Sequence, residues 1–355
     1  MKLQTGVRIG VSGVILAIAL LVTSAIQAQN DINPPVLNGA GATFPAPLYK
    51  KLIAAYKEVD PGTTIKYAVV GSGEGIKRFL DDTVDFGASD VPLTDFQIAS
   101  APHGAITVLV TAGMVVLAYN LPGLNGVLKL NRDTYSALLR GEITRWNDAR
   151  IQAINPRLNL PDREIRLVVR KDSSGTTFVL SSHLSAISPE WRDGPGIGKR
   201  VSWPENAMFA PGNEGVAALV QRSVGSIGYV EYSFAKLLDL KTAHLENKEG
   251  HFIAPDDHVG IATLTANIEQ IPADMRIHIP DPAGTDTYPL ISFTWLLLKK
   301  HYPDGVKGTS LKRFITWCLG EGQSLSSALG YIRLPDEIAK RSNKALATVQ
   351  TTPAP

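Results

Sequence analysis

The chain has 355 residues, of which 44% are hydrophobic, and its 35 basic side chains nearly balance its 33 acidic ones. This length and apolar content suffice for one large or two ordinary hydrophobic cores and exclude a disordered chain. No basic segment contains interleaved aromatic residues, which argues against nucleic acid as a partner. The single cysteine, Cys318, cannot form an internal disulfide, and we expect it to be a buried core thiol.

Residues 1–28 have the layout of a secretory signal peptide. Lys2 and Arg8 precede an apolar run over residues 14–22, and small residues follow up to Ala28. The run is too short to favour a membrane span, and no later segment is long and apolar enough to be one. We therefore expect an exported, soluble, periplasmic protein that is cleaved near Ala28. Its mature net charge is about zero, because the leader contains two basic residues and no acidic one.

The first glycine-rich loop, residues 38–45, is predicted to open a helix. Pro45 suits the first helical turn, and apolar residues recur at helical spacing over 48–56. Thr43 then supplies a hydroxyl donor at the helix N-terminus, and the backbone N–H of Phe44 supplies another.

A second junction of this kind is Gly71-Ser72-Gly73-Glu74-Gly75, which lies between a predicted strand and a predicted helix. It is neither a dinucleotide fingerprint nor a P-loop, because the third glycine comes one residue early and no Gly-Lys-Ser/Thr follows. A plain tight turn and a ligand contact both fit, with Ser72 as helix cap or anion donor. The next predicted strand, 84–89, ends at Asp90, and a lone aspartate there is typical of a turn or cap.

The central segment, residues 170–178, joins a predicted strand over 165–169 to a predicted helix. The first N–H groups of such a helix and its dipole suit an anion. Ser174 and Thr176 add hydroxyl donors, and Arg170 adds a planar fork that fits a tetrahedral oxyanion. Asp172 is near enough in sequence to hold that fork. An ordinary capped helix start fits the same residues.

Four segments of the sequence carry a family resemblance. They are Gly39-Ala40-Gly41-Ala42-Thr43-Phe44-Pro45-Ala46-Pro47, Thr83-Val84-Asp85-Phe86-Gly87-Ala88-Ser89-Asp90, Ser174-Gly175-Thr176 and Gly228-Tyr229-Val230-Glu231-Tyr232. Together they closely resemble the periplasmic phosphate-binding proteins of bacterial high-affinity phosphate ABC importers, over nearly the whole mature chain. The resemblance implies an α/β chain with the type II periplasmic-binding-protein fold. In that fold two α/β lobes are joined by two crossing segments, with the ligand cleft between them.

The resemblance also implies which residues bind phosphate. Carried over by motif, they are Thr43, Phe44, Ser72, Asp90, Arg170, Ser174, Gly175 and Thr176, with Asp172 orienting Arg170. The sequence departs from the family at Gly73 and Glu74, where the family often has a second serine and a further glycine. Lys171 and Ser173 also differ from common family residues, outside the proposed donors.

Domain bounds follow from the same resemblance. Residues 35–112 and 286–345 form lobe I, residues 113–285 form lobe II, and residues 346–355 are a loose tail. The two crossings lie within the β-type run 105–120 and near Thr285. Further predicted elements are strands over 226–230 and 288–298 and helices over 178–184, 216–220, 311–319 and 325–329. Residues 240–283 are predicted to be charged and irregular. Their dispersed histidines match no zinc-site spacing and are expected on the surface; they are His244, His251, His258 and His278.

Phosphate, rather than sulfate, is the expected ligand because phosphate retains protons at neutral pH. Only a protonated oxyanion can donate a hydrogen bond to a buried carboxylate, and Asp90 is the one acid among the donors. Against sulfate, Asp90 is an unpaired charge facing an anion, with a penalty of order several kcal/mol. Arsenate, which also carries protons, is not excluded in this way.

The resulting hypothesis is a monomeric solute receptor, not an enzyme, without metal or cofactor. Its partners are inorganic phosphate and the permease and ATPase subunits of a phosphate ABC importer. One alternative is a secreted phosphate-ester hydrolase, which needs a metal cluster or an activated nucleophile that the sequence does not display. Another is a scaffold relative that has lost ligand binding. The intact set of predicted donors argues against this alternative.

Overall fold

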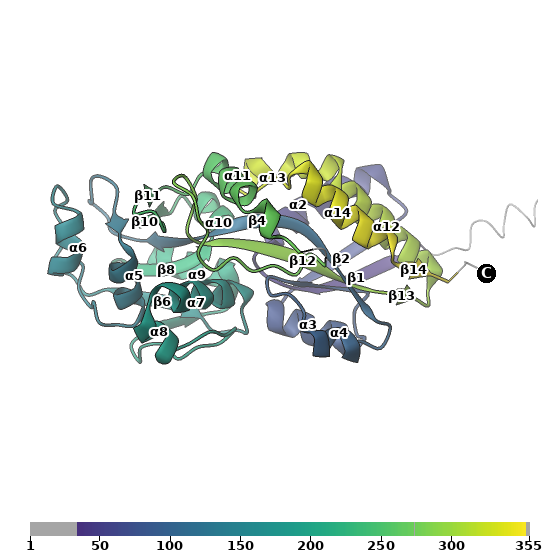
Figure 1. Cartoon of the computed structure of the whole chain (residues 1–355), viewed down its shortest axis with the longest axis horizontal. Helices are drawn as coiled ribbons and strands as arrows, with labels where there is room; N and C mark the ends of the chain where they lie inside the picture. Colours follow the sequence, from purple (N-terminus) through teal and green to yellow (C-terminus); the bar gives the residue numbers. More distant parts are fainter. Residues whose placement is uncertain (1–33, 273, 353–355) are drawn as a thin grey trace, which may run out of the picture. The chain divides into compact units, whose positions relative to one another are not determined.

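The computed structural model describes residues 34–272 and 274–352 (Figure 1). The predicted signal peptide, residues 1–28, lies outside the described residues. Within the described ranges, no helix combines the length and apolar character of a membrane span. The described residues from Val36 onward form one compact unit, which contains all the elements below.

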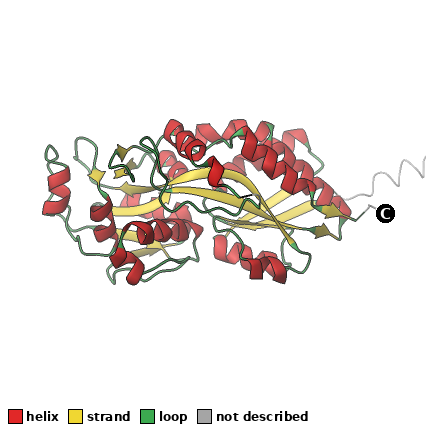
Figure 2. Ribbon diagram, in the orientation of Figure 1, coloured by secondary structure: helices red, strands yellow, loops and turns green. Residues whose placement is uncertain are grey.

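Strands and helices alternate along most of this unit, and helices cover both faces of the main sheet (Figure 2). The strands are β1 (Val36–Gly41), β2 (Thr64–Val69), β3 (Phe86–Ser89), β4 (Ala105–Tyr119), β5 (Lys129–Leu130), β6 (Arg166–Arg170), β7 (Met208–Ala210), β8 (Ser226–Glu231), β9 (Lys241–Thr242), β10 (His244–Glu246), β11 (Phe252–Ile253), β12 (Ile291–Lys299), β13 (His301–Tyr302) and β14 (Gln350–Thr351). The helices are α2 (Ala46–Val59), α3 (Ser72–Leu80), α4 (Asp95–Ser100), α5 (Arg132–Leu139), α6 (Ala149–Ile154), α7 (Gly175–Ile187), α8 (Pro189–Asp193), α9 (Gly212–Arg222), α10 (Tyr232–Leu237), α11 (Asp257–Ala266), α12 (Gly305–Leu319), α13 (Ser326–Leu329) and α14 (Asp336–Ala347), with short 3₁₀ turns η1 (Ile268–Gln270) and η2 (Glu321–Leu325).

The main sheet has the strand order β2-β1-β3-β12-β4-β8-β6-β7, and β9 pairs with the end of β4. β1 pairs in parallel with β2 and β3, and β6 pairs in parallel with β7 and β8. The antiparallel pair β12 and β4 separates these two parallel groups. In Figure 1, α12 and α14 lie on one face of the β1–β3 group and α3 on the other. Both faces are therefore covered, which is typical of parallel sheets.

The long strand β4 belongs to both halves of the sheet. Residues 105–114 pair with β12, and residues 115–119 pair with β8. All of β4 beyond its first two residues is buried, which explains its almost continuous apolar sequence. The register between β12 and β4 shifts at Thr294 and Trp295, where one strand contains an irregularity. The predicted β run over 105–120 is thus confirmed as a single strand.

Three helices begin earlier than their apolar patterns predict. α7 starts at Gly175 instead of Phe178, and α9 and α12 likewise gain a polar first turn. Capping accounts for two of these turns, because Ser174 accepts from the N–H of Thr177 and Asp304 accepts from the N–H of Lys307. Periodicity detects only the buried stripe of a helix, so a polar first turn escapes it.

The expectation of a loose tail over 346–355 is wrong for the residues described there. α14 continues to Ala347, and β14 pairs in parallel with β13. Leu346 and Val349 are buried, and the Lys312 ammonium donates to the Val349 carbonyl at 2.8 Å. Two buried apolar side chains and one strand pairing thus fix the position of this segment, although its sequence shows no apolar periodicity.

Residues 240–283 are also more regular than predicted. They contain β9, β10, β11 and α11, whose N-terminus is capped by the Asp256 carboxylate accepting from the Val259 N–H at 2.8 Å. His278 is half-buried instead of exposed, because its ring packs on Phe178 at 5.1 Å and its Nε2 is buried. This burial lowers the pKa of His278 to about 4.

Candidate anion-binding site

The predicted ligand residues follow the carboxyl ends of four strands of the main sheet, with Ser72 after β2. Thr43 and Phe44 come after β1, Asp90 comes directly after β3, and Arg170 ends β6. Because β1 and β3 are parallel neighbours, the chain leaves both strands at the same edge of the sheet. In open α/β sheets this edge is where ligands bind.

Close contacts join the N-terminal loops to the central segment. A Cβ atom on Gly175 would lie 2.4 Å from Ser72 Oγ and 2.6 Å from Asp90 Oδ2. The N–H of Gly73 donates to the Ser173 carbonyl at 3.0 Å. Gly175 is therefore required for the approach of α7 to these two residues. The structure brings together segments more than eighty residues apart in sequence, as the motifs predicted.

The Arg170 guanidinium is buried and held in one orientation by Asp172. Its Nε donates to Asp172 Oδ1 at 2.9 Å and its Nη2 donates to Oδ2 at 2.5 Å, while Nη1 donates to Thr176 Oγ1 at 3.2 Å. The side chain of Arg170 is only 1% exposed. Burial alone would raise the pKa of Asp172, but the hydrogen bonds and charge of Arg170 and the N–H of Gly212 outweigh it, so the pKa lies below its usual value. The predicted pairing of Asp172 with Arg170 is present.

Asp90 is a buried carboxyl, 3% exposed, that accepts from two hydroxyl groups. Its Oδ1 accepts from Thr294 Oγ1 at 2.6 Å and its Oδ2 accepts from Ser72 Oγ at 3.3 Å. Burial raises the pKa of Asp90 to about 7, although the hydroxyl of Thr294, the charge of Arg170 and the hydroxyl of Ser72 each lower it in part. Asp90 can therefore gain or lose a proton near neutral pH.

Ser72 does not cap its helix. Gly71 occupies the N-cap position of α3, and the Ser72 hydroxyl instead accepts from the Asp90 N–H at 3.1 Å. The backbone N–H and the side-chain carboxyl of Asp90 are thus both hydrogen-bonded to the Ser72 hydroxyl. Of the two roles that the sequence left open, the structure disfavours the cap.

The start of α7 is both a capped helix and a donor cluster. Ser174 caps it, with Oγ accepting from the Thr177 N–H at 3.0 Å, and Gly175 and Thr176 are buried beside the cap. The orphan N–H groups of this 13-residue helix therefore lie next to Arg170 and Asp90. Helix termini of this kind stabilise anions through the same groups and the helix dipole.

Two buried residues in this region carry no local sequence signal for their role. Thr294, on β12, donates to Asp90 across 204 positions of sequence, and Asn213, near the start of α9, donates to both Thr43 and Thr176. Tyr229, within a quoted motif, accepts from the Arg170 N–H at 3.2 Å.

Glu231 completes the surroundings of Asn213 at the end of β8. Its N–H donates to Asn213 Oδ1 at 3.0 Å, and its Oε2 accepts from the Ser233 N–H at 2.9 Å and from the Ser233 hydroxyl. Its Oε1 has no hydrogen-bond partner among the described residues. Burial raises the pKa of Glu231 to about 8, so this carboxyl is mostly neutral at pH 7.

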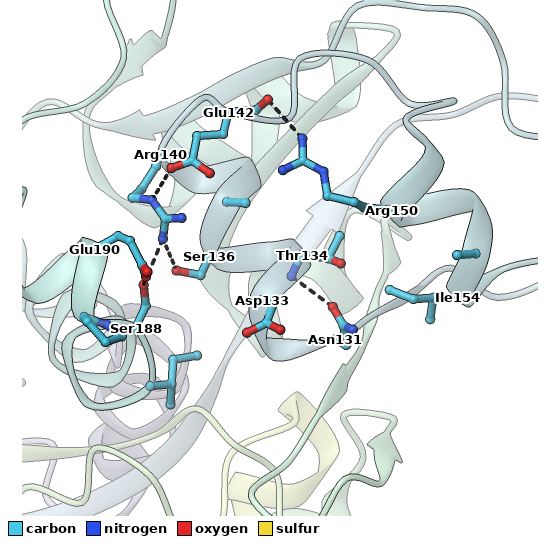
Figure 3. A pocket seen from close by; sticks show the side chains of 14 residues that line it. Asn131, Asp133, Thr134, Ser136, Arg140, Glu142, Arg150, Ile154, Ser188 and Glu190 are labelled. Carbon is cyan, nitrogen blue, oxygen red and sulfur yellow. Dashed lines mark hydrogen bonds and ion pairs between the residues drawn. The ribbon is translucent and has the colours of Figure 1, made fainter.

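A separate cavity of about 620 Å³ lies among α5, α6 and α8 (Figure 3). Its two arginines already have hydrogen-bond partners: Arg140 donates to Glu142 at 2.7 Å and to Ser136 and Ser188 at 2.7 and 2.9 Å, and Arg150 donates to the Glu142 carbonyl at 3.2 Å. The nine predicted site residues, all of them described, are not among those that line it. The cavity is distinct from the candidate site.

Comparison with known proteins gives consistent matches. The family model described as the PBP superfamily domain matches residues 25–321. The phosphate-binding protein PstS of Pasteurella multocida (strain Pm70) is 35% identical over 306 residues, which cover 86% of this chain and 88% of that protein.

Solved structures match over similar lengths. A phosphate-binding protein from Stenotrophomonas maltophilia matches with a TM-score of 0.71 and 20% identity, over 87% of this chain and 93% of that one. The high-affinity periplasmic phosphate-binding protein PfluDING, solved with phosphate bound, matches with a TM-score of 0.71 and 20% identity, over 90% of this chain and 100% of that one. These likenesses confirm the predicted fold, an α/β type II periplasmic-binding-protein fold with two lobes, two crossing segments and a cleft between them.

Proposed function

Because the chain belongs to the PstS family of phosphate-binding proteins within the PBP superfamily, we propose that it is an extracytoplasmic receptor that binds inorganic phosphate between its two lobes and delivers it to a membrane ABC importer. The observation that carries the proposal is the convergence of one buried guanidinium, one helix N-terminus and one buried carboxyl. Arg170 and the start of α7 supply donors, and Asp90 supplies an acceptor. A partly protonated oxyanion needs both kinds of group.

The proposed ligand contacts are those predicted from the motifs. They are the hydroxyls of Thr43, Ser72, Ser174 and Thr176, the backbone N–H groups of Phe44 and Gly175, the guanidinium of Arg170 and the carboxyl of Asp90. Asp172 keeps the guanidinium flat through its two hydrogen bonds. Charge-assisted hydrogen bonds of this kind are the strongest available to a protein at an anion.

The exchange of partners along β4 supports the proposed lobes. Residues 105–114 pair with β12 and residues 115–119 with β8, so the chain passes from one parallel group to the other close to the proposed bound between residues 112 and 113. Thr43, Ser72 and Asp90 then belong to lobe I, and Arg170 to lobe II. Phosphate contacted from both sides should favour a closed cleft.

The remaining parts of the proposal concern context. The receptor is exported through cleavage near Ala28 and acts as a periplasmic monomer, without metal or cofactor and without catalysis. Its membrane partners are the permease and ATPase subunits of a phosphate importer. The described residues contain no group of three or more His, Cys, Asp or Glu side chains placed to hold a metal ion.

Calorimetric titration of the chain from residue 29 onward tests the proposal. We expect one inorganic phosphate per chain, weaker binding of sulfate, and no release of phosphate from a phosphate monoester. Hydrolysis of the monoester would favour the secreted hydrolase, and no binding of phosphate would favour the scaffold relative. A stoichiometry other than one would contradict the single site.

Closure of the cleft has its own measurement. Solution scattering of the same chain should show a smaller radius of gyration at saturating phosphate than without it. An unchanged radius, with saturation confirmed by calorimetry, would contradict closure and leave the binding site itself intact.

A further inference from the structure

Asn213 is a fully buried amide between two of the proposed phosphate donors. It is the second residue of α9 and is 0% exposed. Its Nδ2 donates to Thr43 Oγ1 at 2.8 Å and to Thr176 Oγ1 at 3.1 Å. One amide group, with its two hydrogens, therefore joins the loop before α2 to the start of α7.

Counting hydrogen bonds fixes the direction of both threonine hydroxyls. Thr43 Oγ1 accepts twice, from Asn213 Nδ2 and from the Asn213 backbone N–H at 3.2 Å. Thr176 Oγ1 also accepts twice, from Asn213 Nδ2 and from Arg170 Nη1 at 3.2 Å. A hydroxyl oxygen has two lone pairs and one hydrogen, so each threonine retains only its hydrogen for another partner.

The orientation of the amide is fixed by the end of β8. The Glu231 N–H donates to Asn213 Oδ1 at 3.0 Å, and this carbonyl oxygen must therefore face Glu231. Rotating the amide by half a turn would place Nδ2 against the Glu231 N–H and Oδ1 against two threonine oxygens. That arrangement loses the hydrogen bond at the Glu231 N–H and sets two N–H donors against each other in a buried site, which favours the orientation seen.

We propose that Asn213 is a positioning residue that makes Thr43 and Thr176 obligatory hydrogen-bond donors toward the bound oxyanion. Anionic oxygens accept hydrogen bonds. Because the lone pairs of both threonine hydroxyls are already used, these hydroxyls are preorganised to donate to such oxygens. The inference rests on the proposed function, since Thr43 and Thr176 are placed at phosphate there. Asn213 itself need not touch the ligand.

Two substitutions separate this role from packing. Asn213→Asp keeps the shape of the side chain but replaces the donor by an acceptor, which attracts both hydroxyl hydrogens away from the ligand. Asn213→Ala removes the side chain and leaves the hydroxyls free to rotate. We expect phosphate affinity to fall about 100-fold or more in Asn213→Asp and about tenfold in Asn213→Ala, given the loss of hydrogen bonds to a charged ligand. A packing role predicts the opposite order, because aspartate preserves the shape.

The matched control is Asn267→Asp. Asn267 is 1% exposed, and its Nδ2 donates to the Thr263 carbonyl at 2.8 Å, away from the candidate site. This substitution also buries an acidic group in place of an amide. We expect it to lower the melting temperature while phosphate affinity stays within threefold of wild type.

A double-mutant cycle tests whether Asn213 acts through the hydroxyls. In a Thr43→Val/Thr176→Val background, Asn213→Ala should change phosphate affinity less than twofold, because there are no hydroxyls left to direct. This arm uses no buried charge, so it remains decisive if Asn213→Asp does not fold. Additive losses would overturn the inference.

The titrations with inorganic phosphate also distinguish failure of the inference from failure of the proposed function. Wild-type protein that binds no phosphate overturns both. Wild-type protein that binds phosphate, together with Asn213→Asp and Asn213→Ala variants within threefold of it, overturns only the role of Asn213.

Discussion

Replacing Asp90 by asparagine should abolish the pH dependence of discrimination between phosphate and sulfate. Burial raises the pKa of Asp90 to about 7, so above that pH the wild-type site contains a carboxylate. Monohydrogen phosphate brings its own proton and donates it to that carboxylate. Sulfate has no proton, so it can bind well only if Asp90 first takes one from water.

The size of the effect follows from comparing two costs. An ionised carboxylate about 4 Å from one unit of negative charge costs about 4 kcal/mol at an effective dielectric constant of about 20. Protonating Asp90 instead costs only about 1.4 kcal/mol for each pH unit above its pKa. Protonation is therefore the cheaper route near neutrality. We expect sulfate affinity to fall about tenfold per pH unit between pH 7 and pH 9, while phosphate affinity changes little.

Competition titrations at pH 7, 8 and 9 measure this ratio. In the wild type the phosphate-to-sulfate affinity ratio should rise by about two orders of magnitude across this range. In Asp90→Asn, which has no proton to gain and whose amide can donate to a fully ionised oxygen, the ratio should be lower and flat. A wild-type ratio that does not change with pH would falsify the role given to Asp90, and discrimination would then come from another group.

Further predictions concern the guanidinium, the buried glutamate and their controls. Arg170→Lys should weaken phosphate binding by about 1.5 to 3 kcal/mol for each charge-assisted bond not replaced, because lysine lacks the planar fork that Asp172 holds. Phosphate titration of Arg192→Lys, at an exposed arginine, is the control. Equal phosphate affinities of the two variants would contradict the geometry. The pKa of Glu231 is raised to about 8 from its usual 4.5, so its contribution to stability is fully present below pH 4.5 and is lost as the pH rises to 8. Glu231→Gln, which does not titrate, should therefore gain stability relative to wild type by about 1.4 kcal/mol per pH unit across that window. Urea unfolding at pH 5 and pH 7 measures the gain, and the same difference between variant and wild type at both pH values would contradict it.

Local patterns predicted the strand, loop and helix junctions because each depends on residues close in sequence. The positive φ of Gly71 and the cap at Ser174 act within a few positions, and the alternation or apolar character of the neighbouring strands is equally local. The resemblance then assembled these junctions into one site. Sequence order is enough to name donors such as Arg170 and a partner close in sequence, such as Asp172, but it does not give partners that are distant in sequence.

The residues that sequence reasoning missed depend on distant pairing. Thr294 reaches Asp90 only because β12 is inserted beside β3, and Asn213 reaches Thr43 across 170 positions. Neither residue type is unusual for its element. The tail was misjudged for the same reason, since β14 is a strand only through its pairing with β13. A contact between residues distant in sequence produces no periodic pattern in the sequence around either residue.

The position of β12 also has a consequence for the order of folding. β3 and β4 are consecutive in sequence, yet β12 lies between them, and the Ser342 hydroxyl donates to the Leu109 carbonyl from still later in the chain. The strands β4, β8, β6 and β7 are all present once residue 231 has been made, whereas the group β2, β1 and β3 joins them only through residues 291–299. During synthesis from the N-terminus, the first-made strands therefore present an unpaired edge on β3, a feature that promotes aggregation. We expect a chain truncated before residue 291 to aggregate through this edge, so the segment from residue 291 onward covers the edge of strands made long before it.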